Sequence, residues 1–306
     1  MNKNNYPTQL NNIIESASSI ILGKEHKLRL ALTCILAKGH LLIEDLPGVG
    51  KTTLAHTFAR LLGLQFSRIQ FTSDMLPADV LGISVFEQNN NQFTFHPGPI
   101  FCNVLLADEI NRATPKTQSA LLEAMEEQQV TLDGKTRNLP SPFFVIATQN
   151  PSEQIGTFAL PESQLDRFLM SISLGYPDAQ AERLLLISDD RRDALTNLAI
   201  CLNEAELKEM QEQVQHITTS DALLDYVQAL ISYSRESGLF EYGLSPRAGL
   251  ALLHVSKAWA MLHNRDYVIP EDIQAVLPSV VQHRLHAVDP ETTQVFDILL
   301  KDVAIP

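Results

Sequence analysis

Cysteine is scarce in this sequence, which has only three among its 306 residues: Cys34, Cys102 and Cys201. Each stands alone within an apolar run, so neither the ligand spacing of a metal site nor the pairs of a disulfide framework are present. A protein without disulfides is typical of a reducing compartment, and we therefore expect a cytoplasmic location.

Long hydrophobic stretches are missing as well. The segment Met1 to Gln9 is polar and lacks the apolar core of a signal peptide. No uninterrupted apolar run reaches the ~20 residues of a membrane-spanning helix. With 45% hydrophobic and 19% charged residues, the composition is that of a globular chain and not of a disordered one. These features predict a soluble protein with no membrane span.

Basic residues are few relative to acidic ones, 23 against 36, for a formal charge of −13. Residues 1–176 carry 13 basic and 16 acidic side chains (−3), whereas residues 177–306 carry 10 and 20 (−10). Affinity for nucleic acid depends largely on Lys and Arg, so this balance argues against a nucleic-acid partner. Solvent-facing acids on amphipathic helices are the favoured interpretation, and an acidic face for a basic protein is the alternative.

The first half of the chain alternates short apolar runs with helical stretches, which predicts a parallel sheet flanked by helices. Two of these helices are expected over Thr52–Leu62, closed by Gly63, and Thr117–Gln128. The expected strands are Leu41–Glu44, Phe66–Phe71, Val104–Asp108, Phe143–Thr148 and Leu169–Leu174.

Two hairpins interrupt this alternation. One pairs Ile83–Glu87 with Gln92–His96 around three asparagines, a residue type that tolerates positive φ. The other pairs Val130–Leu132 with Lys135–Arg137 around Asp133-Gly134, a strong two-residue turn signal. Either hairpin is explained by packing alone or by a moving loop above a nucleotide-type sheet.

Beyond Tyr176-Pro177 the pattern becomes helical, without strand signals or internal repeats. The sequence therefore predicts an α/β core over residues 1–176 and an all-α domain over residues 177–306. Several expected helices start with Ser, Pro or Asp, residues typical of helix N-termini. The expected helices are Ala181–Ile187, Glu204–His216, Ser220–Ser234, Pro246–His263 and Pro270–His286.

A phosphate-binding loop follows the first expected strand and opens a helix. Its glycines allow backbone N–H groups to turn inward, and the helix N-terminus adds a positive end. Lys51 is placed to reach terminal phosphates, and the Thr52 hydroxyl to join a Mg²⁺ shell. The first glycine of the usual pattern is replaced by Asp45. The loop runs Asp45, Leu46, Pro47, Gly48, Val49, Gly50, Lys51, Thr52, Thr53.

Two further strands deliver polar side chains to the same edge of the sheet. Val104–Asp108 is apolar up to Asp108, which is followed by Glu109. At the carboxyl edge of such a sheet Asp108 would bind Mg²⁺ and Glu109 would polarise the attacking water. Asn150 follows the strand Phe143–Thr148 and either holds the water or γ-phosphate or simply forms a turn before Pro151.

These stretches together resemble an AAA+ ATPase, and longer strings are similar to the MoxR family over nearly the whole chain. The strings are Leu41–Lys51, Phe71–Gly82, Gly98–Glu127 and Phe144–Phe168. The resemblance implies an αβα P-loop core with ATP and Mg²⁺, a small helical lid, and ring-shaped oligomers that are usually hexamers. It also implies that the two hairpins are the helix-2 insert and the pre-sensor-1 hairpin of this clade, and that Asp45 is compatible with the family.

The resemblance also assigns roles to individual residues. Asn150 falls on the sensor-1 position, Arg167 on the arginine finger and Arg247 on the lid arginine called sensor 2. Residues 23–25 match the segment that borders the adenine. From the residues alone, Arg167 and Arg247 are equally explained as surface arginines.

Members of this family are thought to act as chaperone-like remodelling ATPases on proteins with a von Willebrand factor A domain, and the resemblance implies that role here. Three alternatives stand beside it: a nucleic-acid motor, the ATPase subunit of a metal-chelatase complex, and a nucleotide-gated scaffold with little turnover. The acidic second half disfavours the motor, and the presence of both Glu109 and Arg167 disfavours the scaffold.

Overall fold

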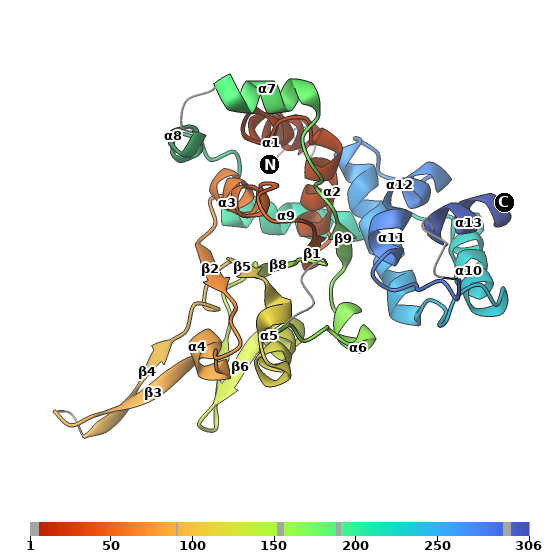
Figure 1. The fold of residues 1–306 in the computed structure, drawn as a ribbon. Helices are drawn as coiled ribbons and strands as arrows, with labels where there is room; N and C mark the ends of the chain where they lie inside the picture. The colour runs from red at the N-terminus through yellow and green to blue at the C-terminus, as the bar shows by residue number, and fades with distance from the viewer. Residues whose placement is uncertain (1–5, 90, 152–155, 188–190, 290–294, 306) are drawn as a thin grey trace.

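A computed structural model describes residues 6–89, 91–151, 156–187, 191–289 and 295–305 (Figure 1). Its centre is a sheet of five strands in the order β2-β5-β8-β1-β9, in which every pair is parallel. All five predicted strands are confirmed, with their ends moved by no more than two residues. The strands are β1 (Leu41–Glu44), β2 (Phe66–Gln70), β5 (Val104–Asp108), β8 (Phe144–Gln149) and β9 (Met170–Ile172).

Both faces of the three central strands, β5, β8 and β1, are buried, which is why these strands are mostly apolar. Leu41 and Ile43 of β1 belong to one hydrophobic cluster, whereas Leu42 between them belongs to another. The first cluster holds α1, α2 and α3, and the second holds α4 and α5, so helices cover the sheet on both sides. The predicted αβα architecture is thereby confirmed. These helices and the short α6 are α1 (Tyr6–Ile20), α2 (Glu25–Leu36), α3 (Lys51–Leu61), α4 (Pro77–Leu81), α5 (Pro115–Glu127) and α6 (Glu162–Leu165).

Both predicted hairpins are present and project from the sheet away from the helices of the second half (Figure 1). The first is β3 (Gly82–Glu87) with β4 (Gln92–Pro97), and the second is β6 (Gln129–Leu132) with β7 (Lys135–Asn138). Asp133 and Gly134 both take positive φ, as their turn requires. The Arg137 guanidinium lies 3.8 Å from the centre of the Phe95 ring, so a cation–π contact joins the two hairpins.

The second half of the chain is helical, as predicted, and its described residues form only two isolated β-bridges, Thr218 with Tyr267 and Phe240 with Ala287. Three of its helices begin with a side-chain cap, from Asn203, Ser220 and Ser245. The helices are α7 (Ala179–Ile187), α8 (Arg191–Thr196), α9 (Glu204–Gln215), α10 (Asp221–Glu236), α11 (Pro246–Leu262), α12 (Pro270–Val281) and α13 (Val295–Asp302).

The last predicted helix is shorter than expected: α12 ends at Val281 and not at His286. After this point the chain turns so that His283 and Arg284 contact the backbone just before β9. The division into domains at residue 176 stays a prediction, and both α9 and α11 pack against α2 from the first half. Within the described ranges, no helix has both the length and the apolar character needed to cross a membrane.

His40, directly before β1, is a buried histidine of the first half. Its Nδ1 accepts the N–H of Val145 at 3.0 Å, and its Nε2 therefore donates to the Met125 carbonyl at 3.2 Å. Burial lowers the pKa of His40 from its usual value to about 4. The neutral ring thus joins β1, β8 and the end of α5.

We expect this ring to make folding stability fall as the pH falls. Between pH 6.5 and 4 the unfolded chain binds a proton at His40 that the folded chain does not, so acid favours unfolding. Between pH 7 and 5 the loss from this residue is about 2 kcal/mol. Urea unfolding of wild type and His40→Gln at both pH values measures it. The prediction is wrong if both proteins lose the same stability.

Candidate nucleotide site

A cavity of about 380 Å³ lies where three neighbouring strands of the sheet end. The residues after β1, β5 and β8 supply most of its lining, because the carboxyl ends of parallel strands share one edge. The phosphate loop, the two predicted acids and the predicted asparagine thus meet in one place. The lining consists of Pro47, Gly48, Gly50, Lys51, Thr52, Thr53, Arg68, Gln70, Asp108, Glu109 and Asn150.

The phosphate loop connects β1 to α3, which begins at Lys51. Gly48 and Gly50 take φ values of 84° and 97°, a region that residues with a side chain rarely enter. A Cβ at either position would meet nothing within 4 Å, so the loop requires glycine for its backbone conformation and leaves open space above it. The first N–H groups of α3 have no acceptor within the helix, and they suit an anion.

Three residues of the predicted loop, Asp45, Leu46 and Val49, do not line the cavity. Val49 packs against the main hydrophobic cluster. Asp45 is buried, and its carboxylate accepts the N–H of Leu46 at 2.9 Å and the N–H of Gly175 at 2.6 Å. Its backbone carbonyl accepts the Lys51 ammonium at 2.6 Å. The carboxylate that replaces the first glycine of the usual pattern is thus engaged by backbone N–H groups and the Ser173 hydroxyl.

Asp108 and Glu109 are held by a threonine of the neighbouring strand. The Thr148 hydroxyl donates to Asp108 Oδ1 at 2.6 Å and accepts the N–H of Glu109 at 2.9 Å. Glu109 has a φ of 56°, in the left-handed region, where non-glycine residues are uncommon. One hydroxyl thus fixes the relative position of two acids that have different predicted roles.

Each of these acids is paired with an arginine that sequence analysis missed. Arg68 of β2 donates to Asp108 Oδ2 at 2.7 Å, and Arg112 lies 2.8 Å from Glu109. A charged residue in the middle of the strand Phe66–Gln70 was the available signal for Arg68, which also lines the cavity.

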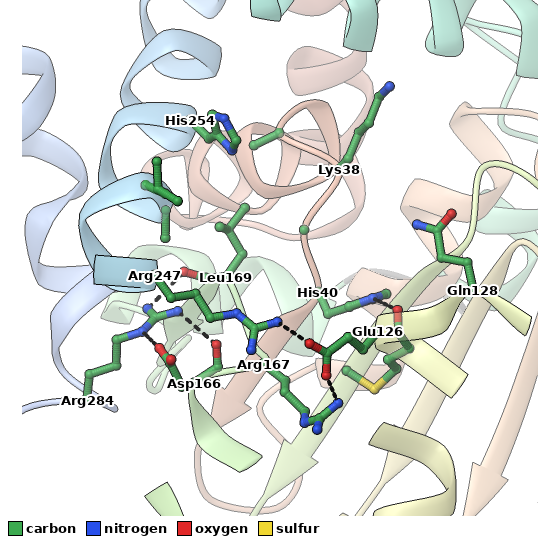
Figure 2. Close-up of a pocket in the computed structure, with 15 residues that line it drawn as sticks. Lys38, His40, Glu126, Gln128, Asp166, Arg167, Leu169, Arg247, His254 and Arg284 are labelled. Atoms are coloured by element: carbon green, nitrogen blue, oxygen red, sulfur yellow. Dashed lines mark hydrogen bonds and ion pairs between the residues drawn. The ribbon is translucent and has the colours of Figure 1, made fainter. Parts of the chain in front are cut away.

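Arg167 and Arg247 lie elsewhere, in a second cavity of about 340 Å³ that shares no lining residue with the first. Figure 2 shows the Glu126 carboxylate between them. One of its oxygens contacts Arg167, and the other accepts from Arg247 at 3.1 Å. Gly39, His40 and Leu169, which precede β1 and β9, line this cavity. It is therefore at the amino edge of the sheet, across the strands from the phosphate loop.

Arg284 anchors the segment that carries Arg167 (Figure 2). Its side chain is 5% exposed and donates to the Asp166 carboxylate at 2.7 Å and to the Phe168 carbonyl at 2.7 Å. The Ser245 hydroxyl, which caps the helix carrying Arg247, also donates to Asp166, at 3.3 Å. The backbones carrying the two arginines are thus fastened to each other through Asp166. No sequence pattern predicted Glu126, Asp166 or Arg284 in this position.

Arg284→Ala is expected to lower the free energy of unfolding by about 3–5 kcal/mol, because it removes the charged partner of the part-buried Asp166 carboxylate and four hydrogen bonds to backbone carbonyls. Arg247→Ala provides the control, since its side chain is 49% exposed and an exposed pair is worth about 0–1 kcal/mol. Urea unfolding measures both, and equal losses would contradict the assignment.

Comparison with known proteins agrees with this fold. Residues 40–170 match the model of the ATPase family associated with various cellular activities (AAA), and residues 232–300 match that of the AAA lid domain. A crystal structure from Cytophaga hutchinsonii, described as a "putative ATPase", has a TM-score of 0.89 and 36% identity. The similarity covers 99% of this chain and 97% of that one. The chain is an AAA ATPase.

Its sequence relatives define the family more narrowly. YeaC of Bacillus subtilis, which is uncharacterized, is 44% identical over 90% of this chain and 86% of its own. Chaperone MoxR1 of Mycobacterium tuberculosis is 39% identical, covering 97% and 82%. Protein MoxR of Methylorubrum extorquens is 33% identical, covering 87% and 84%. The protein belongs to the MoxR family, as its motifs predicted.

Proposed function

We propose that this protein binds and hydrolyses MgATP in the cavity at the carboxyl edge of its sheet. The observation that carries the proposal is the convergence of Lys51, Thr52, Asp108, Glu109 and Asn150 on that single cavity. Lys51 and the N–H groups of the loop would bind the β- and γ-phosphates, and Thr52 and Asp108 would hold the metal. Glu109 would orient and deprotonate the attacking water, with Asn150 beside it.

The residues present fit such a ligand. The glycine loop leaves open space where a phosphate would lie, and Asp108 and Thr52 offer the oxygen ligands that Mg²⁺ prefers. Mg²⁺ supplies charge neutralisation of the phosphates when bound. Arg68 must release Asp108 and Arg112 must release Glu109 before these carboxylates can serve the metal and the water.

Removal of the loop lysine tests the binding step. Lys51→Ala is expected to weaken ATP binding by at least about tenfold, since a charge-assisted contact to phosphate is worth roughly 1.5–3 kcal/mol. Titration calorimetry measures the affinity, with Lys116→Ala on the exposed surface of α5 as the matched control. Phosphate release measured with Mg²⁺ and with excess EDTA tests the metal requirement. Unchanged affinity, or turnover without a divalent cation, would contradict the respective assignment.

We propose further that subunits assemble head to tail into a ring, most simply a hexamer, and that Arg167 acts on the nucleotide of the adjacent subunit. The support is the position of the two cavities at opposite edges of one sheet. A four-residue strand such as β1 is about 13 Å long, so these arginines lie far from the phosphates of their own chain. Arg247, held by the same Glu126, would approach the same neighbour.

For the biological role we propose chaperone-like remodelling in the cytoplasm of a client bearing, or assisted by, a von Willebrand factor A domain. A relative named as a chaperone supports the first part, and three free cysteines support the location. An ATP-driven remodeller must bind its partner differently in different nucleotide states. Pull-downs with Glu109→Gln plus ATP and with nucleotide-free protein test this. Recovery of no such partner in either state would contradict the proposal.

A further inference from the structure

Asp45 occupies the position where a phosphate loop usually has glycine. Its backbone carbonyl and its side-chain carboxylate contact different parts of the molecule. Its carbonyl accepts the Lys51 ammonium at 2.6 Å. Its carboxylate contacts the segment that follows β9, and the residue as a whole is 7% exposed. There Oδ2 accepts the N–H of Gly175 at 2.6 Å and the Ser173 hydroxyl at 3.1 Å. The other oxygen, Oδ1, accepts the N–H of Leu46 at 2.9 Å.

Residues 173–177 connect the sheet to the helical half of the chain, and we call them the connector. A second contact holds the connector from the other side, since the Lys24 ammonium donates to the Tyr176 carbonyl at 2.5 Å. Directly after it, Asp178 and Ala181 lie against Gly23. The connector is thus fastened to the phosphate loop by Asp45 and to the start of α2 by Lys24.

We propose that Asp45 is a positioning residue that couples occupancy of the phosphate site to the connector, and so to the helices that follow it. This inference rests on the proposed function, because it requires a phosphate ligand in the loop. A phosphate group is a stronger partner for an ammonium than a peptide carbonyl is. A bound nucleotide therefore draws Lys51 from the Asp45 carbonyl, and the Asp45 peptide loses one of its restraints. The Gly175 hydrogen bond then opens more often.

Asp45→Asn is the sharpest variant for this idea. Asparagine keeps the size of the side chain and can still accept the N–H of Leu46 through its oxygen. Its amide nitrogen then faces Gly175 N–H and the Ser173 hydroxyl, and it cannot accept from either. Asp79→Asn is the matched control, because Asp79 also accepts a backbone N–H, that of Leu76 at 2.8 Å, but at the start of α4.

Hydrogen exchange of the peptide covering residues 173–178, with and without a slowly hydrolysed ATP analogue, tests the coupling. In wild type and in Asp79→Asn the analogue should speed exchange of this peptide by about threefold or more. In Asp45→Asn exchange should already be about tenfold faster without nucleotide, as a hydrogen bond to a charged acceptor is lost, and the analogue should add nothing. Because coupling is reciprocal, Asp45→Asn should also bind the analogue more tightly than wild type.

The outcomes separate this inference from the proposed function. If wild type binds no analogue by calorimetry, the proposed function fails and the coupling with it. If wild type binds the analogue but the connector exchanges at the same rate, the coupling alone is overturned. If the analogue changes exchange by the same factor in wild type and Asp45→Asn, the nucleotide acts on the connector without Asp45. Asp45 is then only structural, and the inference is wrong.

Discussion

A Glu109→Gln variant should bind ATP and hydrolyse it about 10²–10⁴-fold more slowly than wild type, the range that general acid–base catalysis typically contributes. Glutamine keeps the shape of the side chain and can still accept a hydrogen bond from water, but it cannot take the proton. Binding should persist because Lys51 and the loop N–H groups are untouched. Phosphate release under saturating ATP measures the rate, and titration calorimetry measures the affinity.

The matched control is Glu123→Gln, which makes the same change on the exposed surface of α5. It should leave both quantities unchanged. Glu109 is ion-paired with Arg112 in the structure, so a purely structural role for this carboxylate is the competing explanation. Under that explanation Glu109→Gln would lower the free energy of unfolding and keep normal turnover. Normal turnover would therefore refute the assigned role of Glu109.

The second large effect concerns two variants that should be inactive alone and active together. Arg167→Ala removes the proposed arginine finger, a contribution of about 10³–10⁵ in rate, and Glu109→Gln removes the base. In a head-to-tail ring formed from equal amounts of both, roughly one interface in four pairs an intact Glu109 with an intact Arg167. Mixing before assembly should therefore restore about a quarter of wild-type activity.

This experiment depends on assembly, so native mass spectrometry must first show rings that contain both variants. Each variant taken through the same mixing procedure with itself is the control and should stay inactive. If Arg167 served its own subunit, every subunit in a mixed ring would remain defective. Mixed rings without recovered activity would therefore exclude a site shared between subunits.

The sheet and the phosphate loop could be predicted because each is encoded by residues close together in the sequence. The buried parallel strands are mostly apolar, and Asp108 and Asn150 stand at or just after the ends of two of them. A phosphate loop needs glycines, a lysine and a helix start within a few residues. Each of these patterns lies within a short window of the chain, so it could be recognised before the fold was known.

The side chains that contact these residues could not be predicted, because the contacts depend on strand register and on segments far apart in the sequence. Arg68 reaches Asp108 because β2 pairs with β5 and places Gln70 opposite Asp108. Glu126 reaches Arg247 across 121 positions of sequence. The carboxylate of Asp45 turns toward Gly175, 130 positions away. The early end of α12 has the same origin, since Arg284 is needed beside Asp166.

Helix α5 connects the nucleotide cavity to the cavity that holds Arg167 and Arg247. Its first turns are tied to the segment after Glu109, because the Gln118 amide donates to the Ile110 carbonyl at 3.2 Å. Its last residues include Glu126, which holds both arginines at the opposite edge of the sheet. Thirteen helical residues make a rod about 20 Å long. A displacement of α5 along its axis would therefore move both the segment after Glu109 and the Glu126 carboxylate that holds the two arginines. A single residue, Gln128, separates the end of α5 from the second hairpin, which begins at Gln129, so a displacement of α5 would also move the hairpin.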